Sequence, residues 1–273
     1  MDATTTLLCG DALATLQTLP AGSVQCCVTS PPYWNLRDYG HPDQIGREEW
    51  PTLYIAALVE VFRELRRVLR DDGTLWLNLG DSYQRGQLVG IPWQTALALK
   101  NDGWRLRQDV IWHKPCPIPE SVRDRCTKAH EYVFLFAKAK GYKFNAKAIG
   151  EPYSDSVGRD RVSMPKAGAA RGSNEGQRMR SSFYRRGYRN RRSVWTIKPR
   201  PYPGAHVAVM PPALVELCIL AGSDAGDTVI DPFAGSGTTL AVANAAGRSA
   251  IGIELNPAYI ELARERINRE GAA

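Results

Sequence analysis

The residues Thr29 to Trp34 could build a small, rigid chemical site. They read Thr-Ser-Pro-Pro-Tyr-Trp and follow the apolar run Val24–Val28. Two successive prolines remove two backbone donors and fix two φ angles, so a buried strand ends here in a stiff turn. The turn carries the hydroxyl of Ser30 and two aromatic rings. Alone, the pattern also fits a polyproline II turn or an SH3-type ligand, so its interpretation depends on what lies beside it.

A glycine-rich turn near the C-terminus is the second candidate site. Residues 229–239 read Val-Ile-Asp-Pro-Phe-Ala-Gly-Ser-Gly-Thr-Thr, at the end of a predicted strand, where α/β sheets bind nucleotide-like ligands. Gly235 and Gly237 allow the backbone to approach a ligand closely. The loop lacks the Gly-Lys-Ser/Thr ending of a P-loop. By itself such a turn is weak evidence, because many helices begin this way.

An acidic residue after the next strand strengthens the case for a ligand. Glu254 lies 17 residues after Gly237, near the offset at which an acid accepts hydrogen bonds from a ribose. Asn256 is a candidate N-cap, and Pro257 fits the first turn of the following helix. The two features together predict an adenosine-type cofactor.

The segments around these motifs alternate between strands and helices. Strands are predicted within residues 5–11, 23–30 and 71–81, helices within 13–22, 47–69, 92–100 and 211–222, and strand–turn–helix units at 227–247 and 249–267. Residues 104–114 and 130–138 are rich in β-formers and predict an antiparallel pair. The alternation predicts an α/β fold with a mainly parallel sheet.

Composition is that of an ordinary globular protein. The chain has 273 residues, 44% hydrophobic and 23% charged, enough for one large domain with a small insert. No apolar run approaches the roughly 20 residues of a membrane span, and no secretory signal is visible. The six cysteines show no CxxC pairing. Cys9, Cys26 and Cys27 lie in strand-like runs, which predicts buried, reduced thiols and a cytoplasmic protein.

Positive charge is concentrated in one segment. The formal net charge is +7, and residues 151–200 alone hold 13 Lys and Arg against 4 Asp and Glu. From about residue 142 to 203 the hydrophobic periodicity fails and Gly, Ser, Arg and Asn dominate, so we expect a loop-rich inserted module. A solvated basic loop fits this composition, and so does a surface for a polyanion.

Motifs at both ends of the chain resemble one family. "GDAL" and "TSPPYW" near the N-terminus, with "DPFAGSGTT" and "GIELNPAYIELARERI" near the C-terminus, resemble the amino-methylating DNA methyltransferases that act on cytosine N4 or adenine N6. The order matches the permuted β group of site-specific modification methylases. Residues 109–138 and 193–219 are also similar to the family, so the resemblance covers nearly the whole chain except Ser154 to Arg192.

The resemblance implies a fold and a domain order. The expected fold is a circularly permuted class I methyltransferase, with a doubly wound, mostly parallel, seven-stranded sheet and a loop-rich recognition insert. Residues 1–142 would form the catalytic half and residues 143–203 the target-recognition insert. Residues 204–273 would form the cofactor-binding half.

The resemblance also implies S-adenosylmethionine as the cofactor. Its methionine half would lie against Asp231, Phe233, Gly235 and Gly237, with Thr238 and Asn256 completing the implied cofactor set. Glu254 would hold the ribose. Asp11 would accept from the adenine amine, although an N-cap on the following helix explains it as well.

In such an enzyme, Ser30 to Tyr33 would bind the methyl acceptor. A base inside a duplex must be flipped out, and Tyr33 would be the platform on which it stacks. The Ser30 hydroxyl and the Pro31 carbonyl would accept from the amine, with Pro31 and Pro32 holding that carbonyl still. This chemistry needs neither a metal nor a covalent intermediate.

The target base is expected to be cytosine. In the family that this chain resembles, Ser in the first motif position goes with cytosine N4, and Asp goes more often with adenine N6. The chemistry permits either amine, so N6-adenine remains the alternative. Methylation of cytosine C5 would need a thiolate, and Cys116 is interpreted as incidental because it lies in the linker between two strands, outside the Thr29–Trp34 turn.

The basic insert is expected to read DNA. Arginine contacts phosphates and guanine edges, and interleaved aromatic residues can stack or wedge. The candidate DNA-binding residues are Arg178, Arg180, Arg185, Arg186, Arg189, Arg191 and Arg192. The expected partner is double-stranded DNA. A homodimer and a cognate restriction endonuclease are left open.

Three functions remain in competition. The first is a DNA cytosine-N4 methyltransferase. The second is the same catalyst acting on adenine, on RNA or on a small molecule. The third is a DNA-binding protein that keeps the cofactor fold without catalysis, and the intact residues Ser30, Tyr33, Asp231 and Glu254 argue against it.

Overall fold

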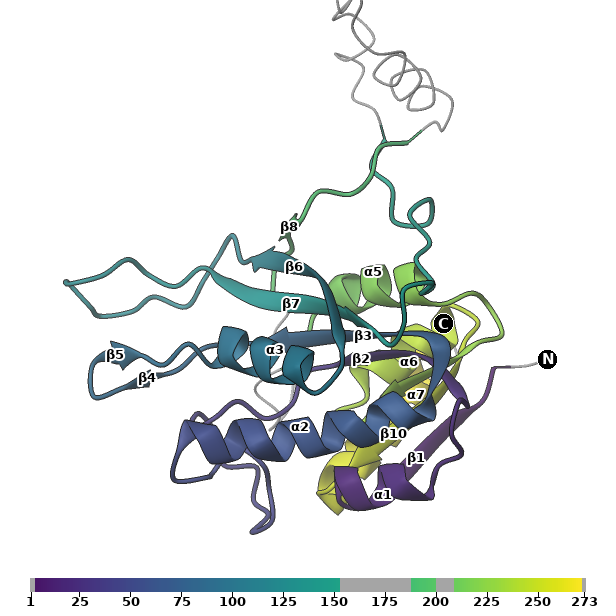
Figure 1. Ribbon diagram of the computed structural model, residues 1–273, viewed down its shortest axis with the longest axis horizontal. Coiled ribbons are helices and arrows are strands. Elements are labelled where there is room, and N and C mark those ends of the chain that lie inside the picture. Colours follow the sequence, from purple (N-terminus) through teal and green to yellow (C-terminus); the bar gives the residue numbers. More distant parts are fainter. Residues whose placement is uncertain (1–2, 153–187, 200–208, 272–273) are drawn as a thin grey trace, which may run out of the picture. The chain divides into compact units, whose positions relative to one another are not determined.

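The structure is a computed structural model that describes residues 3–152, 188–199 and 209–271 (Figure 1). The chain forms two compact units, residues 1–144 with 193–273 and residues 145–192. All the strands and helices described below belong to the larger unit.

The strands are β1 (Thr5–Cys9), β2 (Val24–Thr29), β3 (Leu69–Leu79), β4 (Tyr83–Gln84), β5 (Gln87–Leu88), β6 (Arg105–His113), β7 (His130–Ala137), β8 (Val194–Thr196), β9 (Thr228–Asp231) and β10 (Ser249–Glu254). The helices are α1 (Ala12–Thr18), α2 (Pro51–Val68), α3 (Ile91–Asn101), α5 (Pro212–Gly222), α6 (Thr238–Ala245) and α7 (Pro257–Gly271). Proline stands in the first turn of α2, α3 and α5, where its missing N–H costs nothing.

The main sheet has eight strands in the order β1-β10-β9-β2-β3-β7-β6-β8. The first five are parallel, β7 runs antiparallel to both β3 and β6, and β8 runs parallel to β6. The predicted α/β fold and antiparallel pair are confirmed. The predicted count of seven strands is wrong, because β8 adds an eighth inside a segment that was expected to be loop. It has only three residues, too few to show a period.

Helices cover both faces of this sheet. α2 packs against α1 and α3, and α6 packs against α5 and α7, so the two groups form separate layers (Figure 1). β2 lies between the layers, and all six of its residues are buried, as expected for a central parallel strand. Residues spaced along one face of α2, from Leu58 through Phe62 to Leu65, are fully buried against the sheet. This packing of apolar side chains between helix and sheet holds the strands in place, and with them the residues at the strand ends.

The order in which strands are added to the sheet reverses between the parallel strands β9 and β2. From β9 the chain proceeds to β10 on one side, and from β2 it proceeds to β3 on the other, yet β2 and β9 pair directly. In α/β sheets the crevice at such a switch point is where ligands bind. Asp231 ends β9 and Thr29 ends β2, so both sequence motifs meet there.

The described part of the smaller unit comprises residues 145–152 and 188–192. Glu151 and Arg189 form an antiparallel bridge with two backbone hydrogen bonds of 3.0 Å. A Cβ on Gly150 would lie 2.4 Å from the Tyr188 ring, so glycine permits that close approach. The two ends of the insert are therefore joined to each other.

Two further expectations concern single features of the chain. Among the described helices, none combines the length and apolarity that crossing a membrane requires. All six cysteines are free, and Cys26 and Cys27 are buried as expected. Cys9 is exposed, and the prediction of its burial is wrong because β1 is an edge strand.

Candidate functional site

A buried carboxylate joins the two motifs at the switch point. Asp231 Oδ1 accepts from the Thr29 hydroxyl at 2.6 Å and from the Phe233 amide at 3.0 Å. Its Oδ2 accepts from the Thr239 hydroxyl at 2.8 Å. Asp231 is only 2% exposed. The carboxylate thus connects the end of β2, the glycine-rich turn and the start of α6, and sequence reasoning missed Thr29 and Thr239 as its partners.

Burial raises the pKa of Asp231 to about 6, although the three donors act in the opposite direction. The folded chain therefore holds a proton that the unfolded chain, with an ordinary pKa of 3.8, releases at lower pH. Between these two values the contribution of Asp231 to the free energy of unfolding falls as pH rises. The whole loss is about 3 kcal/mol, at about 1.4 kcal/mol per pH unit.

We expect Asp231→Asn to remove this dependence. Wild type should lose stability relative to Asp231→Asn as the pH is raised from 5 to 7.5, because only the wild-type side chain becomes a buried charge. Thermal denaturation of both proteins across this range measures the difference. Parallel curves of melting temperature against pH would contradict the assignment.

A second, partly buried acid shapes the glycine-rich turn. Glu254 Oε2 accepts from the Gly235 amide at 2.8 Å, and its Oε1 accepts from the Asn256 amide at 2.9 Å. Burial raises the pKa of Glu254 above its usual range, and these amides oppose the rise. Gly235 has a φ of +52°, a conformation that glycine adopts without strain. Each carboxylate oxygen keeps a lone pair for a further donor.

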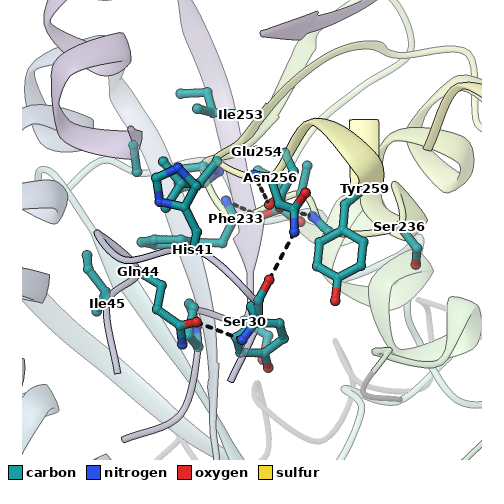
Figure 2. A pocket seen from close by; sticks show the side chains of 18 of the residues that line it. Ser30, His41, Gln44, Ile45, Phe233, Ser236, Ile253, Glu254, Asn256 and Tyr259 are labelled. Carbon is teal, nitrogen blue, oxygen red and sulfur yellow. Dashed lines mark hydrogen bonds between the residues drawn. The ribbon is translucent and has the colours of Figure 1, made fainter. Parts of the chain in front are cut away.

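The first pocket lies at the ends of β9, β10 and β1 (Figure 2). Seven of the eight residues expected at a cofactor site line it: Asp11, Asp231, Phe233, Gly235, Thr238, Glu254 and Asn256. Gly237 is outside this lining. It precedes α6, and a Cβ there would lie 2.9 Å from the Ala263 Cβ, so Gly237 lets α6 and α7 pack closely.

Two of these residues also have structural partners. Asp11 Oδ1 caps α1 by accepting from the Ala14 amide at 2.8 Å, which was the alternative explanation of this aspartate. Asn256 Oδ1 accepts from the Ala258 amide at 2.9 Å, and its Nδ2 donates to the Tyr39 carbonyl at 2.9 Å. Both the oxygen and the nitrogen of the Asn256 side-chain amide therefore have hydrogen-bond partners inside the protein.

The other wall of the pocket comes from a loop that the sequence did not single out. Tyr39 lines the pocket. His41, Gln44 and Ile45 line it too, together with Tyr259 of α7 (Figure 2). The Tyr39 amide donates to Gln44 Oε1 at 2.6 Å. No motif or period marks residues 39–45 as a ligand site, since their position depends on contacts with residues more than 200 places away.

A groove adjoins this pocket on the side of β3 and β7. It has a volume of about 800 Å³, and Ser30, Pro31 and Tyr33 line it together with Asn78 and Glu131. Cys116 lies in the linker between β6 and β7, outside the Thr29–Trp34 turn as predicted, and this exposed thiol also lines the groove. The turn formed by Ser30 to Tyr33, called the polyproline turn below, therefore faces an open space large enough for a planar ring.

Ser30 stands at the junction of the two cavities, and it lines both of them. Its hydroxyl donates to the Tyr33 hydroxyl at 3.3 Å. Thr29, the preceding residue, is bonded to Asp231. A group held in the first pocket and a ring held in the groove would therefore meet at the Ser30 side chain.

The ring of Tyr33 lies directly against the backbone of Gly80. A Cβ on Gly80 would lie 2.5 Å from Cε2 of that ring. The Tyr33 hydroxyl donates to Glu131 Oε2 at 2.7 Å. Burial of the phenol raises the pKa of Tyr33 well above its usual range, and the neighbouring Glu131 charge adds to this. Tyr33 is therefore a fixed, neutral ring.

The carbonyls of the two prolines differ in their partners. The Tyr54 hydroxyl donates to the Pro32 carbonyl at 2.9 Å, whereas no hydrogen bond within the described residues engages the Pro31 carbonyl. Trp34, which had no assigned role, is 1% exposed and belongs to the core. Its indole donates to the Glu48 carbonyl at 2.9 Å. Trp34 and Tyr54 thus anchor the turn and leave Pro31 O available.

Three of the seven candidate DNA-binding arginines lie in the described residues. The guanidinium of Arg189 lies 2.9 Å from Glu151, and that of Arg192 lies 3.1 Å from the same carboxylate. Arg191 Nε donates to the Ile149 carbonyl at 2.8 Å. Each is held within the smaller unit. Arg178, Arg180, Arg185 and Arg186 lie outside the described residues.

Comparison with known proteins agrees with this arrangement. Residues 24–265 match the N6/N4 methyltransferase family model, described as DNA methylase. Type II methyltransferase M.SmaI of Serratia marcescens is 44% identical, over 96% of this chain and 90% of its own length. The putative DNA modification methylase TTHA0409 of Thermus thermophilus, in complex with S-adenosyl-L-methionine, is 30% identical and has a TM-score of 0.67, covering 98% of this chain and 96% of its own. The cytosine-N4-specific PvuII DNA methyltransferase is 20% identical with a TM-score of 0.72, covering 97% of this chain and 87% of its own, which is a likeness of fold.

Proposed function

We propose that this chain, which belongs to the N6/N4 DNA methylase family, transfers a methyl group from S-adenosylmethionine to the exocyclic N4 amine of a cytosine flipped out of double-stranded DNA. In this proposal residues 1–142 form the catalytic half and residues 204–273 the cofactor-binding half. Residues 143–203 form the target-recognition insert. A second copy of the chain and a cognate restriction endonuclease are the protein partners to test.

The first pocket has the donors and acceptors that S-adenosylmethionine requires. Glu254 offers its remaining lone pairs to the ribose hydroxyls, and Asp11 offers its second oxygen to the adenine amine. The backbone of Phe233 to Gly235 and the ionised Asp231 lie where the cationic methionine part would be held. The bound cofactor would supply an electrophilic methyl group on its sulfonium, so that the new N–C bond forms as the C–S bond breaks and the amine releases one proton to solvent.

The residues of the groove prepare the acceptor amine. Tyr33 stacks on the flipped base and is itself supported from behind by Gly80. The Ser30 hydroxyl and the Pro31 carbonyl accept from the two amine hydrogens. This draws the nitrogen towards tetrahedral geometry and turns its lone pair towards the first pocket. Because the turn is already rigid, little reorganisation remains at the moment of transfer.

One observation carries the choice of cytosine. The acceptor at the junction of the two cavities is the neutral hydroxyl of Ser30, and in this family Ser at that position goes with cytosine N4. Adenine N6 is the alternative, since its amine needs the same two acceptors.

DNA that is already methylated distinguishes the two bases. We expect amplified DNA made with N4-methylcytosine in place of cytosine to accept no label from the cofactor. Unmodified DNA of the same sequence should accept label. DNA made with N6-methyladenine is the matched control. Label entering the N4-methylcytosine DNA but not the N6-methyladenine DNA would overturn the cytosine proposal.

The insert should contribute DNA affinity alone. We expect Arg185→Ala with Arg186→Ala to weaken DNA binding and to reduce its dependence on salt. With fewer phosphate contacts, fewer counterions are released from the DNA on binding. Cofactor affinity should not change. Binding titrations over several salt concentrations measure both effects.

The matched control for lost charge is Arg264→Ala with Arg269→Ala on α7, where Arg264 pairs with Glu261. This control should bind DNA like wild type. Equal losses of DNA and cofactor affinity in the insert variant would contradict a separate DNA reader.

A further inference from the structure

A chain of hydrogen bonds leads from Ser30 to a carboxylate on β7. Ser30 Oγ donates to the Tyr33 hydroxyl at 3.3 Å, and the Tyr33 hydroxyl donates to Glu131 Oε2 at 2.7 Å. Asn78 Oδ1 is a second acceptor for Tyr33, at 3.2 Å. Glu131 and Asn78 had no role assigned from the sequence. They come from β7 and β3, which are paired strands.

The partners around Tyr33 fix the direction of this chain. An ionised carboxylate can only accept, and Lys114 Nζ pairs with the other oxygen of Glu131. Asn78 Nδ2 donates to Glu131 Oε2 and to the Tyr132 carbonyl, both at 3.1 Å, which turns Asn78 Oδ1 towards Tyr33. Tyr33 therefore faces two acceptors and must donate to one of them.

The direction continues to Ser30. A hydroxyl has one proton and two lone pairs. Because the Tyr33 proton is directed at Glu131, the Tyr33 oxygen accepts from Ser30, and the Ser30 proton points away from the junction of the cavities. The lone pairs of Ser30 are then free to face the groove.

We propose that Glu131 is a positioning residue that sets the direction of the Ser30 hydroxyl, so that Ser30 presents an acceptor and not a donor to the target amine. This rests on the proposed function, in which Ser30 is that acceptor. Without a forced acceptor behind Tyr33, the two hydroxyls can both rotate. A Ser30 proton aimed at the amine hydrogens would oppose binding of the base in its reactive orientation.

Glu131→Gln tests this with a minimal change of shape. The glutamine amide can donate to the Tyr33 hydroxyl, which permits the hydrogen bonds from residue 131 through Tyr33 to Ser30 to run in the opposite direction. We expect kcat to fall roughly 10²-fold, comparable to the loss of a preorganised hydrogen bond at a reacting centre. Cofactor affinity and the KM for DNA should stay close to wild type. A kcat within twofold of wild type would overturn the inference.

Tyr33→Phe breaks the same chain at its middle and keeps the stacking ring. We expect a loss of kcat similar to that of Glu131→Gln, and we expect the double variant to be no slower than the worse single variant. Groups that act through one another show this lack of additivity. Additive losses would mean that Glu131 acts independently of Tyr33, which overturns the inference.

An infrared measurement reports the direction of the hydrogen bond between residue 30 and Tyr33, in the absence of cofactor and DNA. In Ser30→Cys, the S–H stretch can be isolated by subtracting the spectrum of wild type, which has the same six cysteines. We expect a band shifted to lower frequency by donation to Tyr33, and we expect the shift to be lost when Glu131→Gln or Tyr33→Phe is added. An unchanged band in both would overturn the inference.

Glu64→Gln is the matched control, because Glu64 is a half-buried carboxylate paired with Arg67 on α2, away from both cavities. It should retain wild-type kcat. If Glu131→Gln does not fold, Tyr33→Phe carries the test, and a wild-type kcat in that variant overturns the inference. Ser30→Ala separates the two levels. Full activity in Ser30→Ala rejects the role of Ser30 as the acceptor, on which this inference rests, whereas a slow Ser30→Ala with a fast Glu131→Gln rejects only the role of Glu131. Absence of methyl transfer by the wild-type protein would reject the proposed function.

Discussion

Ser30→Ala is expected to slow methyl transfer by roughly 10²- to 10³-fold, the range seen when one preorganised hydrogen-bonding group is removed from a reacting centre. The loss should appear in kcat. Ser30 lies at the junction of the two cavities, and its hydroxyl is half of the acceptor pair that would draw the amine into its reactive geometry. Single-turnover reactions with labelled cofactor and unmethylated DNA measure the rate of transfer.

Cofactor affinity provides the internal comparison for this variant. The groups proposed to bind the cofactor are Glu254, Asp231 and the turn at Gly235, so Ser30→Ala should bind S-adenosylmethionine like wild type in calorimetry. Ser23→Ala is a matched control, because the Ser23 hydroxyl donates to the Pro20 carbonyl at the opposite end of β2. If Ser30→Ala retained the wild-type rate, the polyproline turn would not be the acceptor site.

Glu254→Ala is expected to weaken cofactor binding by roughly 10- to 10²-fold. A hydrogen bond to a charged group contributes about 1.5–3 kcal/mol, and about 1.4 kcal/mol corresponds to a factor of ten. The substitution also leaves the amides of Gly235 and Asn256 without their present acceptors. The glycine-rich turn should therefore lose order as well. Calorimetric titration with S-adenosylmethionine measures the dissociation constant.

Glu261→Ala is the control for this loss, since Glu261 is an exposed carboxylate on α7 paired with Arg264. It should bind the cofactor like wild type. DNA binding by Glu254→Ala in the absence of cofactor should also be retained, because the groove and the insert are unchanged. Normal cofactor affinity in Glu254→Ala would show that the ribose site lies elsewhere.

Periodic patterns in the sequence predicted most of the fold. The apolar run at Val24–Val28 corresponds to β2, because a strand buried on both faces is apolar along its length. The repeat through Leu58, Phe62 and Leu65 corresponds to α2, because burial of one helix face leaves a helical period in the sequence. β8 escaped because Val194–Thr196 is too short to show a period and is stabilised by pairing with β6. Its β-branched and aromatic residues were the one local signal.

The candidate site was predictable where residues belong to contiguous motifs. Ser30, Tyr33, Asp231, Gly235 and Glu254 all lie at strand ends on one side of the sheet, as parallel strands require.

Partners brought in by tertiary structure could not be read from the sequence. Asn78 and Glu131 are 53 residues apart, yet they share a hydrogen bond. They resemble ordinary polar residues at the ends of buried strands. The loop at Tyr39 reaches the cofactor pocket through Asn256, 217 residues away. A polar residue in a predicted buried strand indicates that a hydrogen-bond network exists, because buried polar groups need a partner. It does not indicate which residues complete that network.

The chemical identity of the methylated nucleoside most directly tests the proposal that cytosine is the target base, which was argued from Ser30. Unmethylated DNA is incubated with the protein and labelled S-adenosylmethionine, digested to nucleosides and examined by mass spectrometry. We expect the label in N4-methylcytosine. Label in N6-methyladenine would contradict the cytosine assignment, and label in no nucleoside of any DNA would contradict methyl transfer to DNA amines altogether.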